Sequence, residues 1–254
     1  MSIGVYSITN KRNMYKIIIA ITLLFTANFA SAQIGNLLNK AKDQVEKTVS
    51  GESGSSTIAD GLKEALNKGV GNAVDQLSEK DGYLKSQYKI LIPEDAQKVV
   101  SVVKKVPGFE NVEDELINKM NDAAEVAAKK ATPIFVDAIK QMTIKDAKNI
   151  LFGEDDAATR YLETSSRTKL YNEFMPIIKS SLKEVNATAY WKTVVDAYNK
   201  IPFQKKLNPD LADHVNQKGL DGLFGLIEKK EEGIREDQAQ RTSPLLKEVF
   251  GQLD

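Results

Sequence analysis

The spacing of apolar residues is the feature that most limits what this chain can fold into. From about residue 57 onward, almost every periodic segment has apolar residues three or four positions apart, the period of an amphipathic helix. Alternating runs typical of strands are scarce, and the best candidate for a short strand is 88–92, which ends at Pro93. The sequence therefore predicts an all-α fold, a single multi-helix bundle-like domain. In its second half, helices are expected at about 144–152, 156–164, 167–185, 188–199, 209–232 and 243–250.

An alanine-rich helical face lies between Val112 and Ala131. Its apolar residues fall mostly on one side of a helix, and five of them are alanines: Ala123, Ala124, Ala127, Ala128 and Ala131. Such a face lets another helix approach closely, so it is a candidate groove for a partner helix or an acyl chain. Pro133 disfavours helical geometry at Thr132, so we expect a break or kink there before the helix resumes through Met142.

The first residues of the chain have the organisation of an export signal. Three basic residues precede an uncharged apolar run at 17–29, which is shorter than the roughly 20 residues that a membrane-spanning helix needs. A small-x-small tripeptide of the kind that signal peptidase accepts follows and ends at Ala32. The sequence predicts a cleaved signal peptide at 1–32, with translation starting at Met1 or Met14, and a periplasmic or secreted mature protein.

The segment that follows the signal is expected to lie outside the main domain. Residues 34–49 form the pattern of a polar amphipathic helix, whose apolar stripe is a candidate contact for peptidoglycan or a membrane surface. The sequence GESGSS at 51–56 is expected to be a flexible linker. The predicted organisation is a helix and linker at 33–56 and a helical domain at 57–254.

Composition excludes several classes of protein. Cysteine is absent, which excludes disulfides, thiolate metal sites and a lipidated cysteine anchor. Removal of residues 1–32 takes away three basic residues, leaving 32 basic against 35 acidic residues and a net charge of about −3. Nucleic-acid binding needs a concentrated basic excess, so no nucleic-acid partner is expected. No apolar stretch of anchor length follows the signal, so no transmembrane anchor is expected.

The sequence NILFGEDDAATRYLE at 149–163 contains the most conspicuous polar cluster. Gly153 is placed to close the preceding helix in the left-handed conformation, and Asp155 or Asp156 is placed to cap the next one. A salt bridge to an arginine elsewhere is a second interpretation, and a metal or catalytic role is a third. The three adjacent acids lack the alternating spacing of an EF-hand loop.

The other candidate residues for chemistry lie on the later helices. His214 is the only histidine, which excludes histidine-rich di-iron and zinc sites, and it is expected to be exposed on a helix. The three glycines of GLDGLFG at 219–225 are three residues apart on one helical stripe, so they are expected to pack closely against another helix. A nucleotide-binding loop is not favoured, because no strand precedes them. Arg235 and Arg241 are best able to form bidentate pairs, for example with the acids of the GEDD turn. Ser243 and its neighbours are expected to cap a last helix that ends at Gly251.

Four stretches of the chain resemble one known protein family. They are GLKEAL (61–66), MNDAAEVAAKKATPIFVDAIKQM (120–142), ILFGEDDAATRYL (150–162) and LDGLFGLIEKKEEGIREDQAQRTSPLLKEVFG (220–251). Together they are similar to the exported bacterial family known as domain of unknown function 4197. The resemblance covers about residues 57–251 and implies a signal-bearing, helical envelope protein of Gram-negative bacteria. It implies no activity and no catalytic residues. The resemblance leads us to expect either a shared ion-pair network or a site among the polar residues in these stretches, which are Asp155, Asp156, Thr159, Asp221, Glu232, Arg235, Arg241 and Thr242.

Two functions follow as hypotheses. The first is a non-enzymatic periplasmic module that binds a protein or an apolar ligand of the envelope, with no cofactor. It rests on the absence of a cysteine, a histidine cluster or a serine nucleophile motif. The second is a carboxylate-dependent hydrolase, with or without a metal ion, that uses Asp155 and Asp156 as ligands or as an acid/base pair, with Arg160 or Arg241 binding an anionic substrate.

Overall fold

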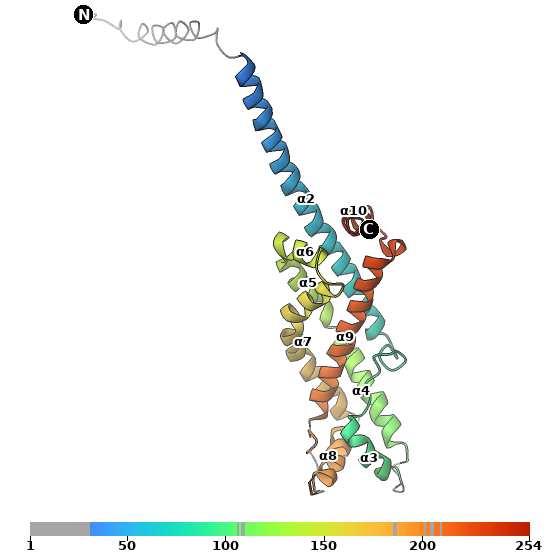
Figure 1. The fold of residues 1–254 in the computed structure, drawn as a ribbon. Helices are drawn as coiled ribbons and strands as arrows, with labels where there is room; N and C mark the ends of the chain where they lie inside the picture. Colours follow the sequence, from blue (N-terminus) through green and yellow to red (C-terminus); the bar gives the residue numbers. More distant parts are fainter. Residues whose placement is uncertain are drawn as a thin grey trace, which may run out of the picture. The chain divides into compact units, whose positions relative to one another are not determined.

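The computed structural model describes residues 31–105, 107, 110–184, 187–200, 202–203, 206–208 and 210–254. The expected signal peptide falls outside these residues, except for its last two. The elements are α2 (Ser31–Ser78), α3 (Glu94–Val103), α4 (Val112–Ala128), α5 (Ala131–Gln141), α6 (Ile144–Leu151), α7 (Ala157–Glu184), α8 (Ala187–Tyr198), α9 (Leu211–Glu236), the 3-10 helix η1 (Gln238–Gln240) and α10 (Pro244–Phe250). The described residues contain no strand, which confirms the all-α prediction (Figure 1).

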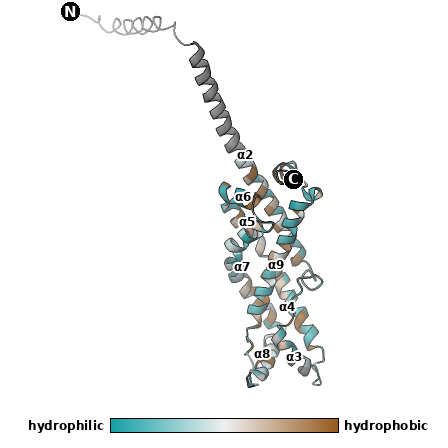
Figure 2. Ribbon diagram, in the orientation of Figure 1, coloured by the Kyte–Doolittle hydropathy of each residue, from teal (hydrophilic) through white to brown (hydrophobic). Residues whose placement is uncertain are grey.

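Internal contacts divide the chain into two units, residues 1–53 and residues 54–254. In the second unit, α9 packs against both α7 and α4, and α7 also contacts α4, α5, α6 and α8. The helices α3 and α8 lie together at one end of this unit, and α5 and α6 lie towards the other end (Figure 1). Hydrophobic and hydrophilic residues are interspersed along these helices, as is typical of amphipathic helices in a bundle (Figure 2).

The helix α2 continues through 51–56, where a flexible linker was expected. Glycine lowers helix stability by only about 1 kcal/mol relative to alanine, and serine by less. The turns that follow are anchored in the core by buried residues that include Ile58, Leu62 and Leu66. Local composition therefore gave the wrong structure for this segment, while the division into domains at residue 56 stays a prediction.

The alanine-rich face of α4 and α5 is buried inside the protein. All five alanines are at most 1% exposed, and α7 and α9 cover α4. A Cβ atom built on Gly219 of α9 would lie 3.5 Å from the Cβ atom of Ala124. Small side chains do allow close helix approach here, but the approaching helices belong to the same chain. The groove expected for a partner helix or an acyl chain is therefore already filled.

Two helix boundaries differ from the prediction. The break after α4 lies at Lys129 and Lys130, and Pro133 sits in the first turn of α5, where a missing amide hydrogen is tolerated. The helices expected at 156–164 and 167–185 are one helix, α7. Its buried residues include Leu162, Ser166, Leu170, Phe174, Ile178 and Leu182, one in every four. This uninterrupted stripe packs the helix continuously despite the serines in its middle.

The expected strand at 88–92 is not formed: Tyr88 lies in a turn, residues 89–92 have no regular secondary structure, and no described segment pairs with them as a partner strand. The buried side chain of Asn121 on α4 takes the place of one. Its Oδ1 atom accepts a hydrogen bond from the Ile90 amide at 2.8 Å, and its Nδ2 atom donates to the Ile90 carbonyl at 2.9 Å. One side-chain amide thus satisfies both backbone groups of Ile90.

Candidate functional site

The acidic turn between α6 and α7 does not cap α7 with its own side chains. Asp155 is exposed and makes no side-chain hydrogen bond with any described residue. Asp156 directly precedes α7, and its Oδ2 atom accepts a hydrogen bond from Arg160 Nε at 2.8 Å. Arg160 also pairs with Glu163 and with Glu228 of α9. The salt-bridge interpretation therefore describes Asp156, and the side-chain caps expected from Asp155 or Asp156 are wrong.

Glu231 of α9 supplies the cap instead. Its Oε1 atom accepts from the amide of Ala158 at 3.0 Å, and its Oε2 atom accepts from the amide of Thr159 at 2.8 Å. The hydroxyl of Thr159 donates to the same Oε2 atom at 2.8 Å. The first amides of a helix have no partner within the helix, and a negative charge is favoured at that end. Glu231 meets both needs from a different helix.

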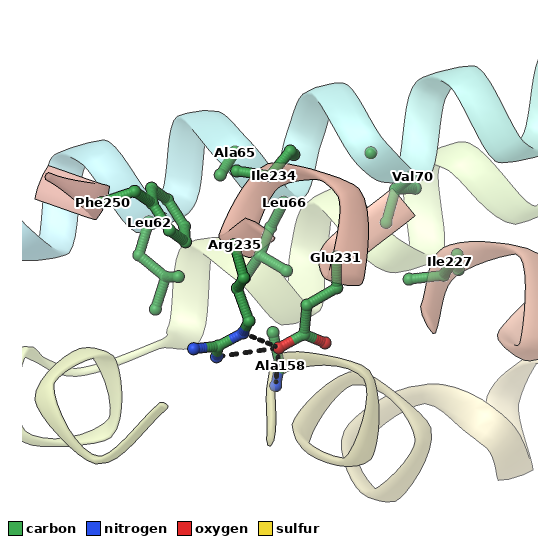
Figure 3. Close-up of a pocket in the computed structure, with 11 residues that line it drawn as sticks. Leu62, Ala65, Leu66, Val70, Ala158, Ile227, Glu231, Ile234, Arg235 and Phe250 are labelled. Carbon is green, nitrogen blue, oxygen red and sulfur yellow. Dashed lines mark hydrogen bonds and ion pairs between the residues drawn. The ribbon is translucent and has the colours of Figure 1, made fainter. Parts of the chain in front are cut away.

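Arg235 lies one turn after Glu231 and satisfies the end of α6. Its Nη1 atom donates to the Leu151 carbonyl at 3.1 Å, and its Nη2 atom donates to the Ile150 carbonyl at 2.8 Å. Arg235 also contacts Glu231 Oε1, with Nε at 3.0 Å and Nη2 at 2.9 Å. Each of the two residues is only 8% exposed. We call Glu231 and Arg235 the α9 clamp, because they hold the end of one helix and the start of the next (Figure 3).

The space beside the clamp is small. A cavity of about 20 Å³ lies among α2, α7, α9 and α10, with Leu62, Leu66, Ile234 and Phe250 in its largely apolar wall (Figure 3). This volume admits about one water molecule. The clamp therefore faces the protein core and does not border a ligand-sized cavity here.

Gly153 closes α6 in a way that differs from the prediction. Its φ angle is not in the left-handed region, and the capping residue is Phe152. A Cβ atom at Gly153 would lie 2.5 Å from the carbonyl oxygen of Asn149. The position thus needs glycine because the backbone passes too close to the last turn of α6 for any side chain.

Arg241 binds the end of the chain and not the GEDD turn. Its Nη1 and Nη2 atoms donate to the two carboxylate oxygens of Asp254 at 2.8 and 2.9 Å. The same guanidinium donates to the carbonyls of Ile234 and Arg235, which are among the last carbonyls of α9. Arg241 lowers the pKa of the Asp254 carboxyl through this bidentate pair. The predicted bidentate geometry is confirmed, but its partner is different.

Asp221 lies apart from the clamp, near the middle of α9. Its Oδ1 atom accepts from Arg167 Nη2 at 2.6 Å, and Lys218 Nζ lies 3.6 Å from its Oδ2 atom. The structure thus brings Thr159 and Arg235 together through Glu231 and places Arg241 next to Arg235. Asp155 makes no hydrogen bond or ion pair with them, and Asp221 pairs with other residues.

Asp221 lines a cleft of about 460 Å³ between the segment 87–94 and α9, which we call the α9 cleft. Gln97, His214, Lys218 and Gly222 complete its wall. The Nε2 atom of His214 lies 2.9 Å from the carbonyl oxygen of Leu91. Because a carbonyl can only accept, Nε2 must carry the proton. Burial is the main cause that lowers the pKa of His214, and Lys218 lowers it further. His214 is therefore half-buried and bonded, contrary to the prediction.

A family model described as a protein of unknown function (DUF4197) matches residues 52–251. The chain belongs to the DUF4197 family. No curated protein and no solved structure matches the chain. The DUF4197 match includes both the start of α7 and the part of α9 that carries the clamp, so the polar residues noted in the sequence lie within the family domain.

Sequence reasoning missed two buried carboxylates of this DUF4197 domain. Glu231 was passed over in favour of its neighbour Glu232, although it stands four residues before Arg235 on the apolar face of α9. Glu125 lies within the alanine-rich face and accepts from the amides of Asp81 and Tyr83 at 3.2 and 3.3 Å. Burial raises the pKa of the Glu125 carboxyl. An acid placed in an otherwise apolar stripe was the available signal in both cases.

The described residues contain no group of three or more histidine, aspartate or glutamate side chains placed to hold a metal ion. Within the same residues, no helix combines the length and the apolar character that crossing a membrane requires.

Proposed function

We propose that this protein is an exported, non-enzymatic binding module and that its ligand site is the α9 cleft. The cleft volume of about 460 Å³ supports this proposal, since ligand sites in proteins occupy about 300–1,000 Å³. Its lining combines apolar and charged groups, including Leu91, Lys218 and Asp221. Export rests on the signal expected at 1–32.

A non-enzymatic role is favoured by where the polar residues are used. The α9 clamp, Thr159 and Arg241 are buried and bonded to helix ends. Asp155 and Asp156, the pair required by the hydrolase hypothesis, do not line the α9 cleft. A pair of catalytic carboxylates needs a cleft that can hold a substrate within hydrogen-bond reach.

The exposed Leu91 and its backbone amide, which is free among the described residues, favour an extended peptide as the ligand. The Leu91 side chain is 51% exposed, although its neighbours Ile90 and Ile92 are buried. The backbone amide of Leu91 donates no hydrogen bond to any described residue. A peptide laid beside this segment would gain a main-chain hydrogen bond there and an apolar contact with Leu91. The partner would be an extended segment of another envelope protein.

The experiment starts from protein secreted by its own signal, whose mass must match a chain that begins at Gln33. Peptides selected from a displayed random library on this protein are then titrated against two variants. Leu91→Asp is expected to weaken binding at least tenfold, because it places a charge in the cleft. Phe152→Asp is the control, since Phe152 is 58% exposed and does not line the cleft. Selection of no peptide, or equal losses in both variants, would refute the proposed site.

A further inference from the structure

A second concave surface lies at the end of the domain where α7 ends and α8 and α9 begin. Its volume is about 630 Å³. It is lined by the charged residues Lys179 and Lys183 of α7, Lys192 of α8 and Asp210, by Thr188, and by the apolar residues Ala189, Leu211 and Ala212. Leu211 and Ala212 are buried and form an apolar base, while the three lysines are exposed. The surface therefore combines an apolar base with three lysine ammonium groups.

The charges of this surface are not balanced. Lys179 Nζ lies 3.9 Å from Asp210 Oδ2, and Lys192 Nζ lies 2.7 Å from Asp196 Oδ2. Lys183 makes no ion pair or side-chain hydrogen bond with any described residue. Because Lys179 and Lys183 are four positions apart on one helix, their side chains are neighbours and repel each other. An anionic group placed between them would relieve this repulsion.

The start of α8 adds to this positive character. α8 begins at Ala187, and Thr188 on its first turn lines the same surface. The start of a helix carries a partial positive charge, which favours an anion nearby. The start of α9 is already satisfied, since Asp210 accepts from the amides of Ala212 and Asp213 at 3.0 and 3.2 Å. Lys183 on α7 is thus the lysine of this surface that has no carboxylate partner among the described residues.

We propose that this surface binds a single-chain anionic amphiphile, such as a fatty carboxylate. Its head group would lie between the ammonium groups of Lys179, Lys183 and Lys192, and its chain would cover Leu211, Ala212 and Ala189. Charge complementarity selects the anion, and the apolar base selects the chain. This site is independent of the α9 cleft, because the two cavities share no residue.

The single tryptophan provides the test. Trp191 is buried on α8 next to Lys192, and it is the only tryptophan in the chain. Titration of the mature protein with a bromine-labelled fatty acid of about ten carbons is expected to quench its fluorescence. Unlabelled decanoate should compete at least tenfold better than decanol, which lacks the charge. Competition as good by decanol, or equal competition by inorganic phosphate alone, would overturn the proposal, since the first removes the need for charge and the second the need for a chain.

Two variants with equal changes in charge complete the test. Lys179→Gln/Lys183→Gln is expected to weaken decanoate binding at least tenfold. Lys129→Gln/Lys130→Gln removes the same charge from exposed positions that do not line the surface, and it should bind as the wild type does. Ala189→Glu places a carboxylate at an exposed position of the lining and should abolish binding without loss of fold. Binding that survives in both the double lysine variant and the Ala189→Glu variant would refute the site.

Discussion

Glu231 caps the first amides of α7 although it follows them by 72 and 73 positions in the chain. Asp156 stands at the position where a cap is usual, but its carboxylate pairs with Arg160. A buried carboxylate that accepts two amides and a hydroxyl is held more firmly than an exposed one. Acidic residues before a helix therefore predicted where α7 begins, but they did not identify the group that caps it.

At the same scale, the single histidine allows a direct titration. Burial and Lys218 lower the pKa of His214 from its ordinary value of 6.5, so we expect its imidazole resonance to titrate below pH 6.5 in the folded protein. The measurement is proton NMR of the untagged mature protein. A midpoint at or above 6.5 would contradict the burial of the His214 imidazole, because burial is the main cause of the lowered pKa and the hydrogen bond to the Leu91 carbonyl opposes it.

The lowered pKa of His214 also predicts how the free energy of unfolding changes with pH. Between the lowered folded pKa and the unfolded value of 6.5, the unfolded chain binds more protons than the folded one. The free energy of unfolding contributed by His214 is therefore fully present above pH 6.5 and is lost as the pH falls through this window. His214→Gln should make stability less dependent on pH there. An unchanged slope would show that His214 carries no such linkage.

At the scale of elements, two glycines of α2 are predicted to respond oppositely to alanine. A Cβ atom at Gly61 would lie within 3 Å of the Val249 side chain of α10, whereas a Cβ atom at Gly71 would meet no atom within 4 Å. Gly71→Ala should raise the free energy of unfolding by up to about 1 kcal/mol, because alanine favours the helix.

Gly61→Ala should instead lower the free energy of unfolding by about 1–3 kcal/mol, because the new methyl group forces α10 away from α2. Urea denaturation of both variants checks the pair. Stabilisation by both substitutions would mean that α10 does not pack on α2 as the structure places it.

Local signals predicted some elements well. The last helix follows from Ser243, Pro244 and Gly251, and the structure confirms that Ser243 Oγ accepts from the Leu246 amide at 3.1 Å. The glycines of GLDGLFG were predicted to pack closely against another helix, and Gly219 does so against Ala124 of α4, whereas Gly222 and Gly225 lie against Tyr83 and Tyr88 outside the helices. Such features depend on neighbours in the chain or on side-chain size alone.

Other elements depend on distant contacts and could not be predicted locally. Two helices were expected at 156–164 and 167–185, but the stripe of buried residues that continues between them keeps α7 whole. The Gly/Ser sequence at 51–56 predicted a flexible linker, but α2 continues through it. Asn121 bonds to the backbone of Ile90 from 31 positions away, and no pattern within either segment predicts this contact.

At the scale of the whole molecule, two of the stretches that resemble the family meet in one structure. The stretch at 150–162 supplies the end of α6 and the start of α7, and the stretch at 220–251 supplies the α9 clamp that joins them. The sequence identified Thr159, Arg235 and Arg241 as a polar cluster but could not tell a site from an ion-pair network. The contacts assign these residues to the scaffold, which leaves the cleft around Asp221 as the proposed site.

The most direct test of this assignment is the free energy of unfolding of Glu231→Ala, measured by urea denaturation beside Asp155→Ala as the control. Removal of one partner of a buried ion pair costs about 3–5 kcal/mol, so Glu231→Ala should lose that amount. Asp155→Ala, at an exposed and unbonded carboxylate, should leave the unfolding free energy unchanged. If Glu231→Ala were as stable as the control, the α9 clamp would not hold the corner between α6 and α7.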